Sequence, residues 1–412
     1  MRIHQGLSAD LGRWSRSEGL NNFCFGQNLV ELMKLAPSFV AFAVFAASLS
    51  AQELPSQAQI LEPLQRVNRY FMEKWPDPGK EIVTNRARPS NIWTRGVYYE
   101  GLTAVQRIAP DAKALDYAVR WGDFHKWGLR TGTRTRNADD QCCGQTYLEL
   151  YLLDPKPERM RDIKADIDFI VSGDRDNDWT WIDAIQMGMP VFARLGVITK
   201  DPKYFEKMHA MYLHTKNVEG GKGLFNPADG LWWRDKDFVA PYKEPNGEDC
   251  YWSRGNGWVV AALVRVLDIL PADAPHRAEY VSMLQTMCEA LRKVQRSDGF
   301  WNASLHDPNN FGGKETSGTA LFTYGMAWGV RHGVLDAAVY RPVIAKAWKA
   351  LATESAQPNG FLGYVQGTGK QPSEGQPTAV DKAPDFEDFG IGCFLLAGSE
   401  VWQLAGKSAV AR

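Results

Sequence analysis

Residues 251–267 read YWSRGNGWVVAALVRVL, a polar and aromatic opening that runs into a nearly uncharged helical stretch. Five other segments share this order. Because a helix that is apolar on all sides must be buried on all sides, the pattern predicts six buried helices. The other five segments are NIWTRGVYYEGLTAVQRI (91–108), DDQCCGQTYLELYLL (139–153), WIDAIQMGMPVFARLG (181–196), TSGTALFTYGMAWGV (316–330) and FEDFGIGCFLLAGSEVW (386–402).

Between these segments lie stretches with apolar residues three and four positions apart, as at Leu61, Leu64 and Tyr70. This spacing is typical of amphipathic helices with one face in water. Six such helices alternating with six buried ones favour an all-α fold, an (α/α)6 barrel that forms a double ring of helices. The amphipathic stretches are residues 57–75, 112–127, 158–171, 202–216, 276–295 and 340–355.

The loops before the buried helices concentrate Asp, Arg and Trp, so we expect the cleft at the N-terminal ends of those helices. A helical solenoid is the structural alternative, but no repeat of fixed period occurs. A D-G turn between aromatic runs in residues 223–238 predicts a small hairpin over the mouth of the cleft.

The N-terminal part of the chain has a different composition from the rest. Lys34 precedes an apolar run over residues 35–47, and small residues follow as far as Ala51. This order is typical of a secretory signal peptide, and the run is too short to span a bilayer. We therefore expect residues 1–50 to be an extension with a signal peptide, and residues 51–412 to be one catalytic domain.

The start of translation is expected at Met33, and the mature chain near Ala51 or Gln52, in the periplasm or outside the cell. The alternative, a helix anchored in the membrane interface, would need a charged face that the run lacks.

The composition of the chain argues against nucleic acid as a partner and favours an oligosaccharide. The 412 residues include 47 Lys+Arg and 48 Asp+Glu, for a net charge of −1. This balance supplies no electrostatic footprint for nucleic acid, and no membrane contact beyond export is expected. The 15 Trp, 14 Tyr and 19 Phe are typical of a cleft for an oligosaccharide, although large cores also use Trp.

Metal and cofactor chemistry has no support from the motifs. The six Cys include the adjacent Cys142 and Cys143 but no C-x-x-C pair, which indicates mostly buried free thiols. Motifs for phosphoryl transfer, metalloproteases, lipases and nicotinamide binding do not occur. We expect no metal and no cofactor.

Carboxylates stand at the start of two buried segments. Asp183 follows Trp181 and precedes an apolar run, so burial would keep its proton to a higher pH, as a general acid requires. The alternative is that Asp183 merely caps its helix. Asp139 and Asp140 open another segment, where one of the two is expected to be the N-cap while the other points into the mouth.

Arg254 lies between Trp252 and Trp258, with Asn256 in the same turn. A guanidinium group offers a planar fork for a carboxylate, and neighbouring rings offer a stacking wall. The pattern favours a pocket for an acidic sugar. The alternative is a structural arginine that stacks on a crowded helix end.

Four blocks in this order, DDQCCGQTYLELY, DWTWIDAIQMGMP, YWSRGNGWV and ETSGTALFTYGMAWG, resemble the signature blocks of glycoside hydrolase family 105, the unsaturated rhamnogalacturonyl hydrolases, which are related to the family 88 unsaturated glucuronyl hydrolases. The resemblance spans about residues 57–405 and implies an (α/α)6 barrel. It also implies removal of a terminal uronic acid with a C4=C5 double bond, by hydration of that bond.

In that mechanism an Asp gives a proton to C4, water adds at C5, and the resulting hemiketal opens to release the sugar. The resemblance implies that Asp183 is this general acid and base and that Asp140 is the second carboxylate, with Asp139 the less favoured claimant. The substrate-binding residues that it implies or that stand in the same loops are Trp93, Tyr99, Asp139, Trp181, Trp233, Trp252, Arg254, Asn256 and Trp258.

The chain departs from some relatives at Trp233 and Arg234, where those relatives place a His. Rhamnogalacturonan, from pectin, is the preferred substrate, while unsaturated galacturonyl, glucuronyl and ulvan-type substrates remain open. Three other classes also remain: a barrel polysaccharide lyase that uses Tyr99 and Arg254, a noncatalytic sugar-binding protein, and a hydrolase of saturated sugars.

Overall fold

Buried and amphipathic helices alternate along the chain in the computed structural model, which describes residues 53–410. Their side-chain burial follows the predicted division into two types. The inner helices are α3 (Trp93–Ile108), α5 (Ala138–Leu153), α7 (Asp183–Thr199), α9 (Ser253–Ile269), α11 (Thr316–Arg331) and α13 (Asp388–Val410). The outer helices are α2 (Gln57–Lys74), α4 (Ala112–Phe124), α6 (Glu158–Val171), α8 (Lys203–Asn217), α10 (Arg277–Lys293) and α12 (Ala337–Ala350).

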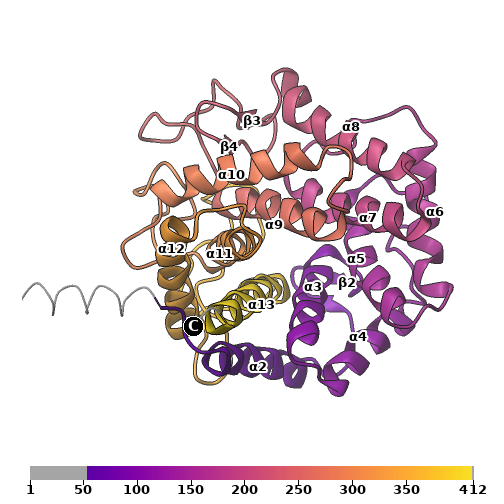
Figure 1. Ribbon diagram of the computed structural model, residues 1–412, viewed down its shortest axis with the longest axis horizontal. Helices are drawn as coiled ribbons and strands as arrows, with labels where there is room; N and C mark the ends of the chain where they lie inside the picture. Colours follow the sequence, from indigo (N-terminus) through magenta and orange to yellow (C-terminus); the bar gives the residue numbers. More distant parts are fainter. Residues whose placement is uncertain (1–52, 411–412) are drawn as a thin grey trace, which may run out of the picture. The chain divides into compact units, whose positions relative to one another are not determined.

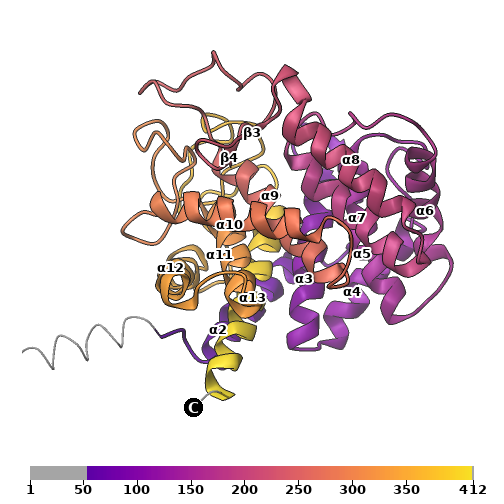
Figure 2. The same cartoon turned by 45° about the horizontal axis from the view of Figure 1, so that its top comes forward.

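The inner helices form a closed ring. Each packs against the next along the chain, and α13 returns to pack against α3 (Figure 1). Each outer helix packs mainly on one inner helix, α2 on α13 and the others on the inner helix that precedes them; α10 and α12 also contact the inner helix that follows, α11 and α13 (Figure 2). The predicted (α/α)6 barrel is confirmed.

Glycine allows the ring to close. A Cβ atom built on Gly101 of α3 would lie 2.4 Å from the carbonyl oxygen of Gly392 in α13, and one built on Gly392 would lie 2.2 Å from that of Val97. Real Cβ atoms do not approach backbone so closely, so the two helices contact each other through backbone. The first and last inner helices therefore need glycine where they meet.

Pro190 interrupts the hydrogen bonds of α7 without ending it. Proline has no N–H, so the carbonyl oxygen of Gln186, four residues earlier, loses its helical donor. Nε2 of Gln145 in α5 donates to that oxygen at 2.7 Å, and Oε1 of Gln145 accepts from Nε of Arg265 in α9 at 2.7 Å. A polar side chain from the neighbouring helix thus satisfies the buried carbonyl.

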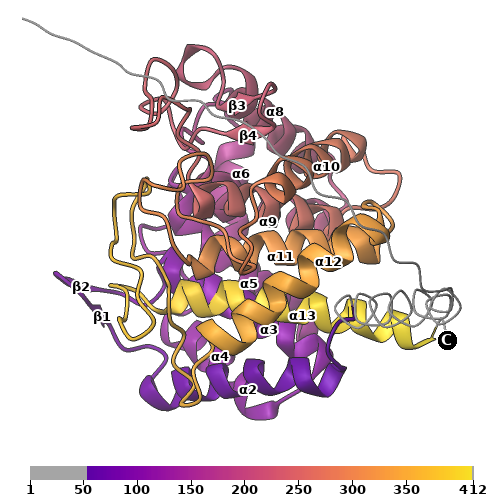
Figure 3. The same ribbon diagram turned by 90° about the vertical axis from the view of Figure 1, so that its left-hand side faces the viewer.

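Long connections gather at the N-terminal end of the inner helices, opposite the end of α13 (Figure 3). The predicted hairpin is present as β3 (Phe225–Asn226) paired with β4 (Leu231–Trp232). A second hairpin, β1 (Ile82–Val83) with β2 (Ala87–Arg88), was not predicted, because two-residue strands leave no alternating pattern in the sequence.

Short helical turns add little to the barrel: a 3-10 turn at Glu219–Gly221 and a π turn at Leu351–Ser355 that continues α12. The cysteines from Cys142 onward are buried and free, as predicted. Over residues 53–410, no helix has both the length and the apolar character needed to cross a membrane. The expected signal peptide and Met33 start lie outside the described residues.

Candidate active site

Asp183 is the first residue of α7, and its carboxylate lies at the mouth of the barrel. The N-cap position belongs to Ile182, which makes no side-chain cap, so Asp183 does not cap the helix. Oδ2 of Asp183 is 3.2 Å from Nε of Arg234. Burial raises the pKa of Asp183, while the positive charges of Arg234 and then Arg254 lower it. Burial outweighs the two arginines, so the pKa of Asp183 is raised, in the direction that an acid catalyst needs.

Asp139 lies in the first turn of α5, partly exposed and facing the charge of Asp183. Burial, the charge of Asp183 and that of Asp140 raise the pKa of Asp139 to about 7, against the lowering effect of Arg130 and Arg234. A carboxyl group with this pKa exchanges a proton near neutral pH. Asp139 and Asp183 therefore form a coupled pair, named here the cleft carboxylates.

Asp140 has a different environment from its neighbour. Its side chain is 2% exposed, and Oδ1 accepts from Nε of Arg130 at 2.7 Å. The hydroxyl groups of Thr131 and Thr135 donate to Oδ2. These three donors, all from the segment before α5, engage both carboxylate oxygens of Asp140 within the protein itself.

The cap of α5 also differs from the sequence expectation. Asn137 is the N-cap, and its side chain accepts from N of Asp139 at 3.0 Å. Neither Asp139 nor Asp140 is the cap, because the helix begins one residue before the pair. Both stand in the first turn, where the helix dipole favours negative charge.

Arg254 is 1% exposed at the start of α9. Its Nη1 and Nη2 donate to the carbonyl oxygens of Gln366 and Gly367, each at 2.7 Å. Its guanidinium group lies over the ring of Trp252 at 4.5 Å and over that of Phe389 at 4.9 Å. The structural, stacked arginine that the sequence offered as an alternative is present. Both terminal nitrogens of the guanidinium group donate to backbone carbonyl oxygens of the loop before α13.

Aromatic side chains line the same end of the barrel. Trp93 lies edge-on to Trp258 with ring centroids 6.1 Å apart, and it packs on Phe389 at 5.4 Å. Nε1 of Trp258 and Nε1 of Trp233 are buried, and neither has a hydrogen-bond partner between residues 53 and 410. Trp181 is partly buried and pairs through its backbone with Asp235.

Three other predicted binding residues are engaged in the protein's own packing. Tyr99 is buried and stacks on Trp121 of α4 with centroids 4.2 Å apart, between inner and outer helices. Nε1 of Trp252 donates to Oε1 of Gln366 at 2.9 Å. Asn256 bonds both N and O of Trp232, at 2.9 and 3.0 Å, and so fixes β4 to α9.

Sequence reasoning missed the partners of the carboxylates. Arg234 was noted only as a departure from relatives, yet it bonds Asp183 from 51 positions away. Arg130 was not noted at all. A signal existed for Arg130, because Arg and Thr recur in the stretch RTGTRTR (130–136) directly before the acidic pair.

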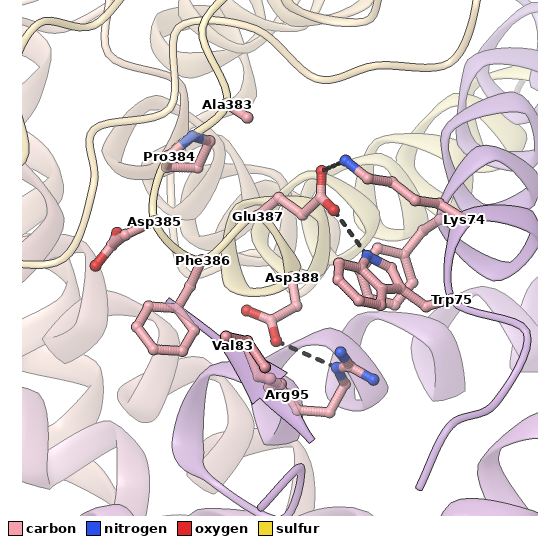
Figure 4. Close-up of a pocket in the computed structure, with 12 residues that line it drawn as sticks. Lys74, Trp75, Val83, Arg95, Ala383, Pro384, Asp385, Phe386, Glu387 and Asp388 are labelled. Atoms are coloured by element: carbon pink, nitrogen blue, oxygen red, sulfur yellow. Dashed lines mark hydrogen bonds and ion pairs between the residues drawn. The ribbon is translucent and has the colours of Figure 1, made fainter. Parts of the chain in front are cut away.

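A pocket of about 150 Å³ lies between α2, α3 and the start of α13 (Figure 4). Glu387 accepts from Lys74 at 3.0 Å and from Nε1 of Trp75 at 2.7 Å. Asp388 accepts from Nε of Arg95 at 3.2 Å. These charges are matched within the pocket, so it adds no group to the cleft carboxylates.

Within the described residues, no group of three or more His, Cys, Asp or Glu is arranged to hold a metal ion. The expectation of a reaction without metal or cofactor stays a prediction.

A closed ring of buried helices with two coupled carboxylates and tryptophans at one end defines a carbohydrate-active enzyme of the helical-barrel class. The model of Glycosyl Hydrolase Family 88 matches residues 64–405, and the chain belongs to this family. The resemblance found in the sequence is confirmed, with family 88 as the family that matches.

Two curated relatives are each named "Unsaturated 3S-rhamnoglycuronyl hydrolase". The protein from Formosa agariphila is 33% identical over 333 residues, which cover 76% of this chain and 84% of the relative. The protein from an Alteromonas species is 31% identical over 342 residues, or 77% of this chain and 79% of the relative. The predicted activity, a glycoside hydrolase acting on an unsaturated uronyl group, is confirmed at the level of the family.

Solved structures agree on the fold. A family 88 glycosyl hydrolase from Bacteroides vulgatus is 33% identical with a TM-score of 0.76, covering 85% of this chain and 100% of that one. A structure named as a polysaccharide lyase is 32% identical with a TM-score of 0.77, covering 85% and 98%. A possible family 105 member from Salmonella enterica, 19% identical with a TM-score of 0.68, covers 85% and 95% and supports the fold alone.

Proposed function

We propose that this glycoside hydrolase removes a terminal 4,5-unsaturated glucuronic acid from a rhamnose-containing oligosaccharide by hydration of the C4=C5 bond. The observation that carries the proposal is the pair of cleft carboxylates, Asp139 and Asp183, in a family 88 barrel. The two relatives favour a rhamnoglycuronyl substrate over the rhamnogalacturonan of the sequence interpretation.

In the proposed mechanism Asp183 gives a proton to C4, and water adds at C5. Asp139 is the second carboxylate, which accepts the proton that the water gives up. The hemiketal at C5 opens and releases the sugar. Asp139 takes the role that the sequence interpretation gave to Asp140, because Arg130 and two threonines already engage Asp140. Trp93, which is partly buried and lies edge-on to the fully buried Trp258, supplies the stacking wall.

The test uses an unsaturated glucuronyl–rhamnose disaccharide and follows the absorbance of the conjugated uronate. We expect the absorbance to fall with the wild-type enzyme, and solvent deuterium to appear at C4 of the released keto sugar. The matching saturated disaccharide should not react. Cleavage of the saturated sugar with solvent oxygen at C1 would show an ordinary glycosidase instead.

Matched variants assign the roles. Asp139→Asn and Asp183→Asn should each lower turnover by roughly 10²-fold or more, the usual size of acid–base effects. Asp140→Asn, one residue away, should lose far less turnover in its folded form. An equal loss in folded Asp140→Asn would return the role of second carboxylate to Asp140.

A polysaccharide lyase is the second candidate, and the 32% identical structure named as a lyase favours it. A lyase creates the conjugated double bond, so absorbance would rise on an intact uronate polymer. Hydration consumes the bond, so the sign of the change separates the two activities.

Export is a further part of the proposal, carried by the order of residues 34–51. Mass spectrometry of the exported protein should find a mature chain that begins near Ala51 or Gln52. A mature chain containing residues before Met33 would contradict both the start and the cleavage that we propose.

A further inference from the structure

Arg234 lies directly after β4 and contacts two carboxylates. Its Nε is 3.2 Å from Oδ2 of Asp183, and its Nη1 donates to Oδ2 of Asp235 at 2.6 Å. The shorter contact has the length of a strong charge-assisted hydrogen bond, while the longer one is at the end of the normal range. Of the two, the contact with Asp183 is therefore the easier to give up.

The backbone around Arg234 is fixed to the start of α7. The carbonyl oxygen of Arg234 accepts from N of Ile182 at 3.0 Å, and Asp235 pairs with Trp181 in an isolated β-bridge. Oδ1 of Asp235 accepts from N of Asp237 at 2.9 Å. The guanidinium group can thus pivot about Asp235 while it stays at the mouth of the cleft.

Arg234 is accessible to another acceptor, whereas the one unpaired donor of Arg254, its Nε, is buried. The Arg234 side chain is 20% exposed, and its Nη2 makes no hydrogen bond within residues 53–410. Arg254 is 1% exposed and uses both ends of its fork on the carbonyl oxygens of Gln366 and Gly367. A carboxylate that binds both terminal nitrogens of Arg254 would break two buried bonds, whereas one that binds Nη2 and Nε of Arg234 would break only the long contact with Asp183.

The charge of Arg234 acts on both cleft carboxylates, since it lowers the pKa of Asp183 and that of Asp139. Strongly coupled carboxyl groups titrate as a pair. A substrate carboxylate that neutralises the guanidinium removes this lowering, so the pair then holds a proton to higher pH. The other charged groups that face the pair are Asp235 beside Arg234, Arg254 from α9, Asp140 from α5 and Arg130 from the preceding loop.

We propose that Arg234 is an exchangeable counter-ion, which pairs with Asp183 in the free enzyme and passes to the carboxylate of the acidic sugar when substrate binds. The cleft carboxylates then keep the proton that is added to C4. The inference rests on the proposed function, which supplies the acidic substrate. It makes Arg234 the substrate-binding residue that couples the charge of the substrate to the protonation of the pair.

The pH dependence of turnover tests this exchange. The pH profile of kcat/KM reports the free enzyme, and that of kcat reports the complex. For the wild-type enzyme we expect the alkaline limb of kcat to lie roughly one pH unit or more above that of kcat/KM. In Arg234→Gln the two limbs should coincide, because no counter-ion is exchanged, and Arg234→Lys should restore part of the separation.

A matched control is Arg175→Gln, which removes an arginine that is 60% exposed and paired with Asp178. This variant should keep the separation of the limbs. Coincident limbs in the wild-type enzyme would overturn the inference, as would a full separation in folded Arg234→Gln.

A binding measurement covers the case in which Arg234→Gln does not fold. Calorimetric titration of the wild-type enzyme with the saturated glucuronyl–rhamnose disaccharide, near pH 8 in buffers of different ionisation enthalpy, should show proton uptake on binding. Binding without uptake overturns the inference. Absence of activity on every unsaturated uronide would instead contradict the proposed function, since the uptake measurement needs binding alone.

Discussion

Adjacent residues in this cleft have opposite environments. Asp139 is partly exposed and coupled to Asp183, whereas Asp140 is held by Arg130 and two threonine hydroxyl groups. Consecutive side chains on a helix point about 100° apart, so only one of two neighbours can face the ring centre. The rotation of α5 about its own axis thus sets the different environments of Asp139 and Asp140.

Asp139→Asn should stabilise the protein at alkaline pH. The folded pKa of about 7 is above the unfolded value of about 3.9, so stability from this group is present below pH 4 and is lost as pH rises through 7. At pH 8 the free energy of unfolding of the variant should be about 2 kcal/mol larger than that of the wild type, so the variant is the more stable protein. The difference should vanish near pH 4. Urea unfolding at the two pH values measures it.

The control for this variant is Asp140→Asn, which should lower stability at pH 8, since it weakens the hydrogen bonds from Arg130 and Thr131. A gain in stability with Asp140→Asn, and none with Asp139→Asn, would show that the environments of the two residues are assigned the wrong way round.

Arg254→Lys should act on stability. The carbonyl oxygens of Gln366 and Gly367 accept from two different nitrogens, and the single nitrogen of an ammonium group does not reproduce their spacing, so at least one buried bond should be lost, at a cost of about 2 kcal/mol. Thermal unfolding measures the loss, with the exposed Arg175→Lys as control. An unchanged Tm together with a raised KM for the acidic substrate alone would favour the sequence-based role of Arg254 on the substrate carboxylate.

At the scale of elements, α5 and α7 are joined by a polar contact inside an apolar core. Gln145 donates to the carbonyl oxygen that Pro190 leaves without a helical donor. Gln145→Leu removes that donor and also the acceptor of Arg265, so we expect a loss of about 3 kcal/mol in the free energy of unfolding. Chemical denaturation of the folded protein measures it.

The matched control is the next residue. Thr146 is buried, and its hydroxyl group has no hydrogen-bond partner in the part of the chain that the structure describes. Thr146→Val keeps the shape and removes an unsatisfied group, so it should be neutral or stabilising. Equal losses in both variants would mean that packing volume, and not the carbonyl of Gln186, sets the cost.

At the scale of the whole barrel, closure depends on the contact between its first and last inner helices. A Cβ on Gly392 would lie 2.2 Å from the carbonyl oxygen of Val97. Gly392→Ala should therefore separate α3 from α13 and destabilise the protein by about 3 kcal/mol or more, since overpacking displaces backbone here. Differential scanning calorimetry measures the change.

Gly406→Ala is the control, because it changes the same residue type in the same helix. Its Cβ would meet only the end of the flexible Gln57 side chain, at 2.5 Å. Alanine is also the better helix former, so this variant should be neutral or slightly stabilising. A loss equal to that of Gly392→Ala would place the cost in α13 itself and not in ring closure.

Over residues 53–410, the pattern of residues alone predicted twelve helices and their inner and outer types. Apolar periodicity is a local property, and a helix without a polar face has to be enclosed by others. The segments 181–196 and 251–267 therefore indicated both their own burial and the position of Asp183 and Arg254 at their N-terminal ends.

Which side chains meet at the start of the inner helices follows from contacts between distant segments. The tertiary contacts pair Arg234 with Asp183, Arg130 with Asp140, and Tyr99 with Trp121. These choices depend on how each helix is rotated and on where a distant hairpin returns. Rotation and return are fixed by contacts across the ring, which a local pattern of residues does not contain.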